Sequence, residues 1–270
     1  MEKFKNKKQV VNTNISKVSE ETIIHRHGFS KKNAYIYFEE SPYLGFELEV
    51  DCEQVKEDFQ KKLCEVFYQH KSQHYTVEKD STLTNGAEIV FQPHSFSELK
   101  NYLNTEFAEV LKKLKEIGCQ EFAPKAGFHL HVSKTLFGET DEVQQDNVAK
   151  IWKLLSNYPN KFIAIGHRIN LKYSTFTDLR LEFNSLFKHK VRKEWSKKNY
   201  RKIRYQAINV INPNTVEFRF FQSSLNLNLL NFWIDLVYYI SNKSCEISWT
   251  EVDSWNAWFS DFPYNIEDFC

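Results

Sequence analysis

Two histidines and a serine alternate with apolar residues in the segment GFHLHVS, residues 127–133. In a β-strand this spacing puts His129, His131 and Ser133 on one face, while the apolar residues point the opposite way into a core. Imidazole nitrogens can bind a metal or contact phosphate oxygens, whereas a histidine on a solvated sheet face does neither. The segment alone leaves both interpretations open, so the decision depends on the residues that lie beside it.

Four further segments repeat this alternation, with acidic, basic or amide side chains in place of the histidines. Each has an apolar face suited to packing on helices and a polar face suited to a site. Taken singly, each is also typical of a sheet with one solvated face, and an E-x-R pair is typical of a cross-strand ion pair. The polar positions are Glu47 and Glu49 in GFELEV, Glu88 in GAEIVF, Asn209 in YQAINVI, and Glu217 with Arg219 in TVEFRFF.

Four carboxylates gathered on one sheet face would repel one another strongly. A solvated face would intersperse lysines among them, and these strand motifs contain none. A bound divalent cation would remove the repulsion, and carboxylate oxygens with an occasional imidazole suit Mg²⁺ or Mn²⁺. We therefore expect a metal site that includes Glu47, Glu49, Glu88 and Glu217.

Hydrophobic periodicity predicts the elements that must position these residues. The turn-like NPN at 212–214 joins the last two strands, which predicts an antiparallel hairpin. Ser95 with Glu98 forms a capping box that opens one long helix, and Gly118 ends it. The expected strands are 43–50, 74–80, 86–92, 127–133, 205–211 and 215–221, and the expected helices are 52–71, 95–117, 141–158 and 227–242, with 160–169 a helix or turn and 245–270 folding back onto the core.

With 270 residues, 41% hydrophobic and 16% aromatic, the chain has enough apolar material for a large globular core. Its apolar runs are short and interrupted by charge, which predicts neither a membrane-spanning helix nor a secretory signal peptide. The five cysteines form no CxxC pair, and their odd number does not suit a closed disulfide framework. We therefore expect reduced thiols and a cytoplasmic location.

The net charge of +1 conceals two basic segments on an acidic body. Residues 1–34 carry eight Lys or Arg against three Glu, and residues 187–205 carry nine against one. The first segment is expected to be partly disordered and to precede a single domain over 35–270. The second has three interpretations: a solvated face, a track for a nucleic acid backbone, or a lid over an acidic ligand. No nucleic-acid-binding module accompanies it, which favours the solvated face over the nucleic acid track.

Taken in order, GFELEV, KDSTL, GAEIV, GFHLHVS, RYQAINV and TVEFRFFQSSLN closely resemble the amidoligase family. That family belongs to the carboxylate–amine ligases, a group that includes glutamine synthetase and glutamate–cysteine ligase. GFHLHVS is also similar to the G-M-H-x-H-x-S segment of glutamine synthetase, and VEFR is similar to its E-x-R strand. The resemblance covers roughly residues 22–260, and the order and spacing of the motifs together make it specific.

The resemblance implies an α+β fold, in which a curved, mostly antiparallel sheet forms a half-barrel with helices on its convex side. It implies that ATP and Mg²⁺ lie on the concave face, that ATP phosphorylates a substrate carboxylate, and that an amine then displaces the phosphate. Carried onto this sequence, it implies metal ligands Glu47, Glu49, Glu88, His129 and Glu217, catalytic roles for Arg219, Glu88 and His129, and a substrate or nucleotide site that includes Asp80, His131, Ser133, Asn209, Arg168 and Arg204.

The chain departs from the family pattern in one strand and lacks one common nucleotide motif. Thr215 stands where glutamine synthetase has an arginine, so one phosphate contact is absent or comes from the basic segment 187–205. The phosphate-loop pattern G-x-x-x-x-G-K-[ST] is also absent, so metals and side chains must hold any nucleotide.

Two other functions stay open beside an ATP-dependent ligase that acts on amine and carboxylate substrates. A metal-dependent nuclease or phosphodiesterase could hold metals with Glu47, Glu49, Asp80 and Glu88. Against it, GAEIVFQ lacks the lysine that many such sites place two residues after the acid. A non-catalytic relative could instead bind a partner through the same cleft or through the basic segments, although all four carboxylates are retained.

Overall fold

The structure is a computed structural model, and it describes residues 23–27, 42–52, 58–169, 171–176 and 204–270. The fold is α+β, built on one six-stranded sheet in which every neighbouring pair of strands is antiparallel. The strand order β2-β3-β1-β4-β6-β5 puts the first acidic strand and the histidine strand side by side at the centre. The strands are β1 (Leu44–Val50), β2 (Tyr75–Glu78), β3 (Ala87–Phe91), β4 (Gly127–Ser133), β5 (Ile208–Asn209) and β6 (Thr215–Gln222).

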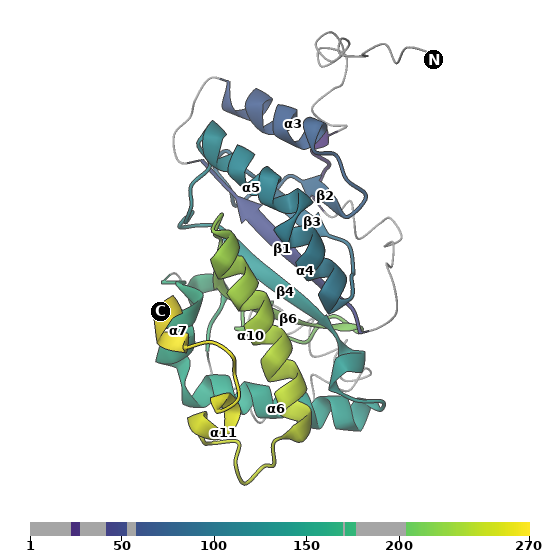
Figure 1. The fold of residues 1–270 in the computed structure, drawn as a ribbon, viewed down its shortest axis with the longest axis vertical. Helices are drawn as coiled ribbons and strands as arrows, with labels where there is room; N and C mark the ends of the chain where they lie inside the picture. Colours follow the sequence, from purple (N-terminus) through teal and green to yellow (C-terminus); the bar gives the residue numbers. More distant parts are fainter. Residues whose placement is uncertain (1–22, 28–41, 53–57, 170, 177–203) are drawn as a thin grey trace, which may run out of the picture.

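Helices α4, α5 and α10 lie side by side across one face of the sheet, as Figure 1 shows. Alternation of apolar residues in the strands explains this covering, because every second side chain must find an apolar partner. The helices are α3 (Phe59–Gln69), α4 (Phe96–Asn104), α5 (Glu106–Ile117), α6 (Asp141–Asn157), α7 (Pro159–Gly166), α10 (Leu227–Glu246) and α11 (Trp255–Phe259), with 3₁₀ turns at Lys134–Phe137, Leu171–Tyr173 and Ile266–Phe269.

The single helix expected over 95–117 is wrong, since the chain breaks there into α4 and α5. Ser95 does cap the start, accepting a hydrogen bond from the Glu98 amide at 3.3 Å, and Gly118 ends α5 with a left-handed φ of 98°. The break falls at Thr105, whose hydroxyl donates to the Asn101 carbonyl at 2.7 Å. A threonine that bonds back to its own helix in this way competes with the backbone ladder.

The core between the sheet and its helices is largely aromatic. Phe46 of β1 packs against Phe128 of β4 with ring centroids 5.1 Å apart, and Phe128 lies 5.9 Å from Trp233 of α10. The tail folds back as expected, with Trp258 fully buried. Phe269 stacks on Phe232 of α10 at 3.9 Å.

The structure describes only parts of the two basic segments. Residues 23–27, grouped above with the N-terminal basic segment, pair with the β2 edge through a parallel bridge from His25 to Glu78. The basic segment 187–205 lies outside the described residues except for Arg204 and Tyr205.

All five cysteines are reduced thiols. Among the helices that the structure describes, none has the length and hydropathy needed to cross a membrane.

Candidate metal centre

Three glutamates form a row across three neighbouring strands on the sheet face opposite the aromatic core. Glu88 of β3 stands directly opposite Glu78 of β2 on one side and Glu49 of β1 on the other. All three are buried, with at most 7% of the residue exposed. Directly opposed like charges destabilise a sheet, and burial increases the effect. Glu78 was not among the expected site residues, although the alternation in YTVE places it on the same face as Asp80.

The histidines of β4 extend the polar face toward β6. His129 stands opposite Glu47 of β1, while His131 stands opposite Glu217 of β6. Asn209 of β5 is opposite Glu217 and donates to its Oε2 at 2.7 Å. The five expected metal ligands are therefore brought together by strand register alone, from residues up to 170 positions apart in the chain (Glu47 to Glu217).

A register shift in β6 places Arg219 beside this face. Phe128 pairs with Phe221, but Leu130 pairs with Phe218, so β6 has one more residue than β4 over this stretch. Both Arg219 and Phe220 consequently lie opposite His129. Such bulges re-aim side chains and are frequent next to active sites.

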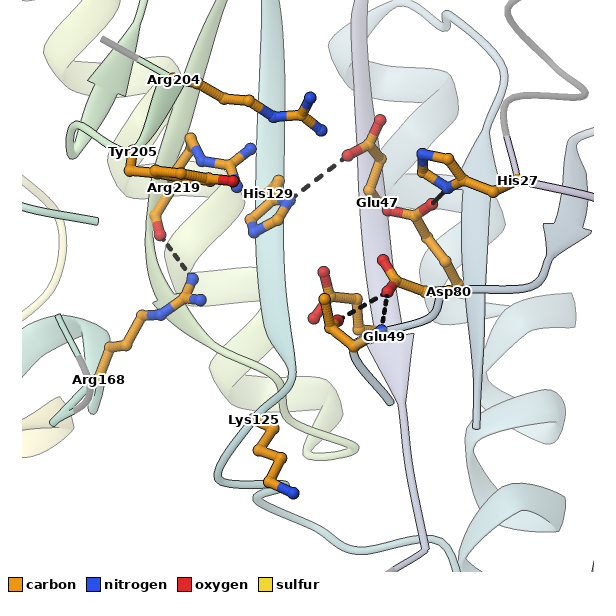
Figure 2. A pocket seen from close by; sticks show the side chains of 12 residues that line it. His27, Glu47, Glu49, Asp80, Lys125, His129, Arg168, Arg204, Tyr205 and Arg219 are labelled. Atoms are coloured by element: carbon orange, nitrogen blue, oxygen red, sulfur yellow. Dashed lines mark hydrogen bonds and ion pairs between the residues drawn. The ribbon is translucent and has the colours of Figure 1, made fainter. Parts of the chain in front are cut away.

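A pocket of about 600 Å³, measured with its open mouth, lies over the polar face. Figure 2 shows carboxylates on one side of His129, which we term the acidic wall, and guanidinium groups on the other, which we term the cationic wall. The acidic wall is Glu47, Glu49, Asp80 and Glu88, the cationic wall is Arg168, Arg204 and Arg219, and His27, Thr82, Lys125 and Tyr205 complete the lining.

The histidine–glutamate separations suit metal ligands better than hydrogen bonds. Nδ1 of His129 lies 3.4 Å from Glu47 Oε2 and 3.8 Å from Glu217 Oε1, and Nε2 of His131 lies 3.5 Å from Glu47 Oε1. Good hydrogen bonds between nitrogen and oxygen are shorter, near 2.9 Å. Two ligands of one Mg²⁺ at about 2.1 Å are separated by about 3.0 Å when adjacent and about 4.2 Å when opposite. The chemistry and spacing of these donors therefore fit a divalent cation.

Four overlapping groups of three side chains could hold such an ion among the described residues. In each group the ligand atoms lie within 4.8 Å of one another. None of the described residues hydrogen-bonds to Nε2 of His129, although this atom is buried. The groups are Glu49–Asp80–Glu88, Glu47–Glu88–His129, Glu47–His131–Glu217 and His27–Glu78–Glu88.

The acidic wall is electrostatically strained without a cation. Burial, followed by the charges of Glu47 and Glu49, raises the pKa of Glu88 to about 10. Burial also raises the pKa of Glu49 to about 7, against a 2.7 Å hydrogen bond from the Gly127 amide that lowers it. Glu47 behaves differently: burial favours its neutral form, but the neighbouring charge of His131 and the hydrogen bond from His129 hold its pKa well below the usual range.

The two imidazoles differ in charge. Burial and the charge of Arg219 lower the pKa of His129 to about 4, so this ring is neutral at pH 7 and has a lone pair to offer. Burial pulls the pKa of His131 down as well, but the charge of Glu47 outweighs burial and raises it above the ordinary value. A metal at His131 would have to displace a proton, whereas a metal at His129 would not.

The cationic wall is anchored by backbone and carboxylate contacts. Arg219 is ion-paired with Glu217 two residues earlier in β6. Arg168 donates through Nη1 to the carbonyls of Arg219 at 2.7 Å and Phe221 at 3.2 Å, so this nitrogen supports the bulge. Gly127 permits this packing, because a Cβ there would lie 2.7 Å from both Arg168 Nη1 and His129 Nε2.

Asp80 is presented by a tight turn between β2 and β3. Its Oδ1 accepts hydrogen bonds from the Thr82 amide at 2.6 Å and the Thr82 hydroxyl at 2.7 Å. The far end of the turn is held by Asp51, a buried carboxylate that accepts from the amides of Thr84 at 3.0 Å and Asn85 at 2.7 Å. A short chain of hydrogen bonds thus sets the position of one acidic-wall residue.

Most of the expected site residues meet at the pocket, and some do not. Ser133 lies at the end of β4, bonded to Thr135, and does not line the pocket; Asn209 is occupied by Glu217, as described above. His131 and Glu217 lie behind the lining, in one of the metal-ligand groups. Sequence reasoning missed the pocket residues His27, Thr82, Lys125 and Tyr205. The first three come from segments with no strand alternation, whereas Tyr205 begins the expected strand 205–211 and was not singled out within it.

Comparison with known proteins adds no family to this geometry. A scan against protein-family models and a search of curated proteins both found no match.

Proposed function

We propose that this protein is an ATP-dependent carboxylate–amine ligase, built on a half-barrel sheet of the glutamine synthetase kind. The observation that carries the proposal is the acidic wall facing the cationic wall across His129, with histidine–glutamate separations of 3.4 to 3.8 Å. Carboxylates on one wall and guanidinium groups on the other suit a ligand that combines a metal cation with a polyphosphate. The acids would hold the metals and the guanidinium groups would hold the phosphates.

Mg²⁺ or Mn²⁺ would be held by Glu47, Glu49, Glu88, His129 and Glu217. Bound there, the metal would neutralise the charge of the phosphate oxygens and fix their orientation. The residues need little rearrangement for this role, because the ligand atoms within each group of three already lie within 4.8 Å of one another. Asp80 belongs to one of the ligand groups and, like Glu47, is only partly buried, so it could contact either the metal or the substrate.

The cationic wall would act on the transferred phosphoryl group. The carboxylate oxygen of the substrate attacks the γ-phosphorus of ATP, the bond to the bridging oxygen breaks, and ADP leaves. Arg219 and Arg204 face the pocket where charge spreads over the equatorial oxygens, and a guanidinium fork suits that charge. The amine then attacks the acyl carbon, phosphate leaves, and the amine loses a proton to give the amide.

A carboxylate of the acidic wall could accept the proton that the amine loses. Glu49, with a pKa of about 7, is half ionised near neutral pH and lines the pocket. A general base works best when its pKa lies near the working pH. Glu49 can serve as this acceptor only where it is not bound to a metal, so its two proposed roles are alternatives; Glu88, with a pKa of about 10, stays protonated without a metal.

The direct test is release of ADP and phosphate from Mg²⁺–ATP, screened over mixtures of amines and carboxylates, with the amide identified by mass spectrometry. Turnover should require both substrates and should fall at least a hundredfold in His129→Ala. Glu116→Gln is the matched control. It removes an exposed carboxylate of α5 that is paired with Lys113 and does not line the pocket, so this variant should retain full activity. Binding of Mg²⁺–ATP with no turnover on any mixture would contradict the ligase and favour a binding protein.

A second candidate, metal-dependent phosphodiester hydrolysis, is favoured by one observation. The lysine that GAEIVFQ lacks has a spatial substitute, because Lys125 lines the same pocket as Glu49, Asp80 and Glu88. Incubation of the protein with plasmid and single-stranded DNA in Mn²⁺ or Mg²⁺ decides between the two functions. Cleavage that EDTA abolishes and that Lys125→Ala weakens would replace the ligase by a nuclease.

A further inference from the structure

His27 reaches the pocket from a stretch of chain that adds to the edge of the sheet. The His25 amide donates to the Val77 carbonyl at 2.8 Å, and the Lys79 amide donates to the His25 carbonyl at 2.8 Å. These two bonds form a parallel bridge with β2 at Glu78. His27 follows two residues later, on the acidic side of the pocket in Figure 2, and its Nδ1 lies 3.7 Å from Glu88 Oε2.

Two buried carboxylates meet this imidazole. Glu78 and Glu88 are paired across β2 and β3, with 1% and 5% of each residue exposed. Within the described part of the chain, the carboxyl group of Glu88 makes no hydrogen bond, and Nδ1 of His27 lies 3.7 Å from its Oε2. A buried carboxylate without a hydrogen bond is costly, so its surroundings point to a missing positive ligand.

The spacing of the three side chains favours a cation over direct contact. A distance of 3.7 Å is too long for a hydrogen bond between His27 and Glu88. It lies between the separations of about 3.0 and 4.2 Å expected for adjacent and opposite ligands of one small divalent ion. One ligand atom from each of His27, Glu78 and Glu88 lies within 4.8 Å of the other two.

We propose that His27, Glu78 and Glu88 bind a divalent cation of their own at the β2 edge of the sheet. Neither His27 nor Glu78 belongs to the motifs that carry the family resemblance, so this site is additional to the metals of the proposed ligase. A ligand set with an imidazole nitrogen favours Mn²⁺, Co²⁺ or Zn²⁺ over Mg²⁺. Glu88 has two oxygens and belongs to three of the ligand groups, so it links this cation to the acidic wall.

The cation would also tie residues 23–27 to the site. The imidazole of His27 is half exposed, with 52% of its side chain accessible, whereas Ile24 is buried in the core and His25 makes two backbone bonds to β2. Coordination would add a third attachment on the pocket side. Binding of the metal and ordering of this segment are therefore coupled.

The test is a count of Mn²⁺ equivalents by electron paramagnetic resonance on metal-free protein, without nucleotide. His27→Ala and Glu78→Gln should each lose one equivalent, or weaken one by tenfold or more, and keep the others. Arg26→Ala is the matched control, since this exposed neighbour has no ligand atom, and it should keep every equivalent. With Co²⁺, the visible absorption band of a nitrogen-ligated site should disappear in His27→Ala.

The outcomes separate this proposal from the ligase. An unchanged Mn²⁺ count and unchanged affinities in both His27→Ala and Glu78→Gln would overturn the edge site. Loss of an equivalent in both variants would support it, even in a protein that hydrolyses no ATP. Glu49→Gln lies outside the edge group and should remove a different equivalent, which shows that the assay resolves the two sites.

Discussion

At the scale of single residues, the strongest feature of this molecule is a glutamate that burial keeps protonated. Glu88 stands between Glu78 and Glu49 in one row, and its pKa is raised to about 10 by burial and by the neighbouring carboxylates. A sheet that needed only stability would place an apolar residue there. The arrangement is explained if the row has a cation to hold, because a metal converts repulsion between carboxylates into coordination.

The first prediction concerns how stability depends on pH when no metal is present. Glu88 in the unfolded chain ionises near its ordinary pKa of 4.5, whereas in the folded protein it holds its proton up to about pH 10. The folded state therefore binds more protons between these values, so the free energy of unfolding falls as pH rises through them. Each such proton contributes a slope of up to about 1.4 kcal/mol per pH unit.

Urea unfolding of metal-free protein between pH 7.5 and 8.5 measures this slope. Glu88→Gln keeps a neutral side chain at every pH, so its stability should fall less steeply than that of wild type. Equal slopes in the two proteins would show that Glu88 is already ionised in the folded protein, and the raised pKa of Glu88 would be wrong.

The second prediction concerns Arg219, and it rests on the proposed function. Arg219 is paired with Glu217 and faces the pocket, so Arg219→Lys keeps the charge but loses the planar fork that suits phosphoryl oxygens. We expect kcat to fall by on the order of a hundredfold, with the unfolding midpoint near wild type. A change in KM alone, with kcat preserved, would make Arg219 a structural partner of Glu217.

At the scale of elements, strand alternation was the signal that worked. It predicted the strands that carry Glu47, Glu88, His129 and Glu217, and the register then brought these residues onto one face. It did not predict that most of the polar face is buried as well, because alternation reports direction and not what covers a face. Nor could it rank His129 against His131, since both point the same way.

Other features depended on contacts that no local pattern records. The bulge of β6 at Arg219 and Phe220 follows from the pairing of two distant strands. The helix break at Thr105 follows from one side-chain hydrogen bond, and the stripe of apolar residues runs through it without interruption. His27 was hidden in a polar segment, and only its backbone pairing with β2 brings it to the site. Glu78, by contrast, could have been found by extending the alternation to YTVE.

The third prediction belongs to the turn that carries Asp80. Asp51 accepts three backbone hydrogen bonds, from Cys52 and from the far end of the turn at Thr84 and Asn85. Asp51→Ala should lower the free energy of unfolding by about 2–4 kcal/mol, because buried amides lose their acceptor. It should also weaken Mn²⁺ at the Glu49–Asp80–Glu88 group.

Asp51→Asn is the matched control for that change. It keeps one oxygen acceptor and nearly the same volume, so its effect on unfolding in urea should be smaller than that of Asp51→Ala. If both variants leave stability and Mn²⁺ affinity unchanged, the turn is held by other contacts and Asp51 does not position Asp80.

At the scale of the whole molecule, charge is sorted to an unusual degree. The net charge is only +1, but the acidic strands hold their carboxylates on one sheet face, whereas the sequence segments 1–34 and 187–205 are rich in Lys and Arg. The metal-free molecule thus contains a local excess of negative charge that folding must overcome. Cations that relieve this excess should stabilise the whole domain and not merely the site.

The last prediction follows from that linkage. At a free Mg²⁺–ATP concentration of about 100 times Kd, one site adds roughly 2.7 kcal/mol to the free energy of unfolding. For a domain of this size that corresponds to a rise of roughly 5–10 °C in the melting temperature.

The measurement is differential scanning fluorimetry of metal-free protein with Mg²⁺, ATP, both, or neither. Mg²⁺ and ATP together should exceed the sum of their separate effects, because each ligand completes the site of the other between the two walls. The double variant Glu47→Gln/Glu49→Gln should no longer respond to Mg²⁺, because it lacks two of the proposed ligands. A melting temperature that stays constant across all four conditions would show that the acidic wall binds no cation, and it would contradict both the metal centre and the ligase.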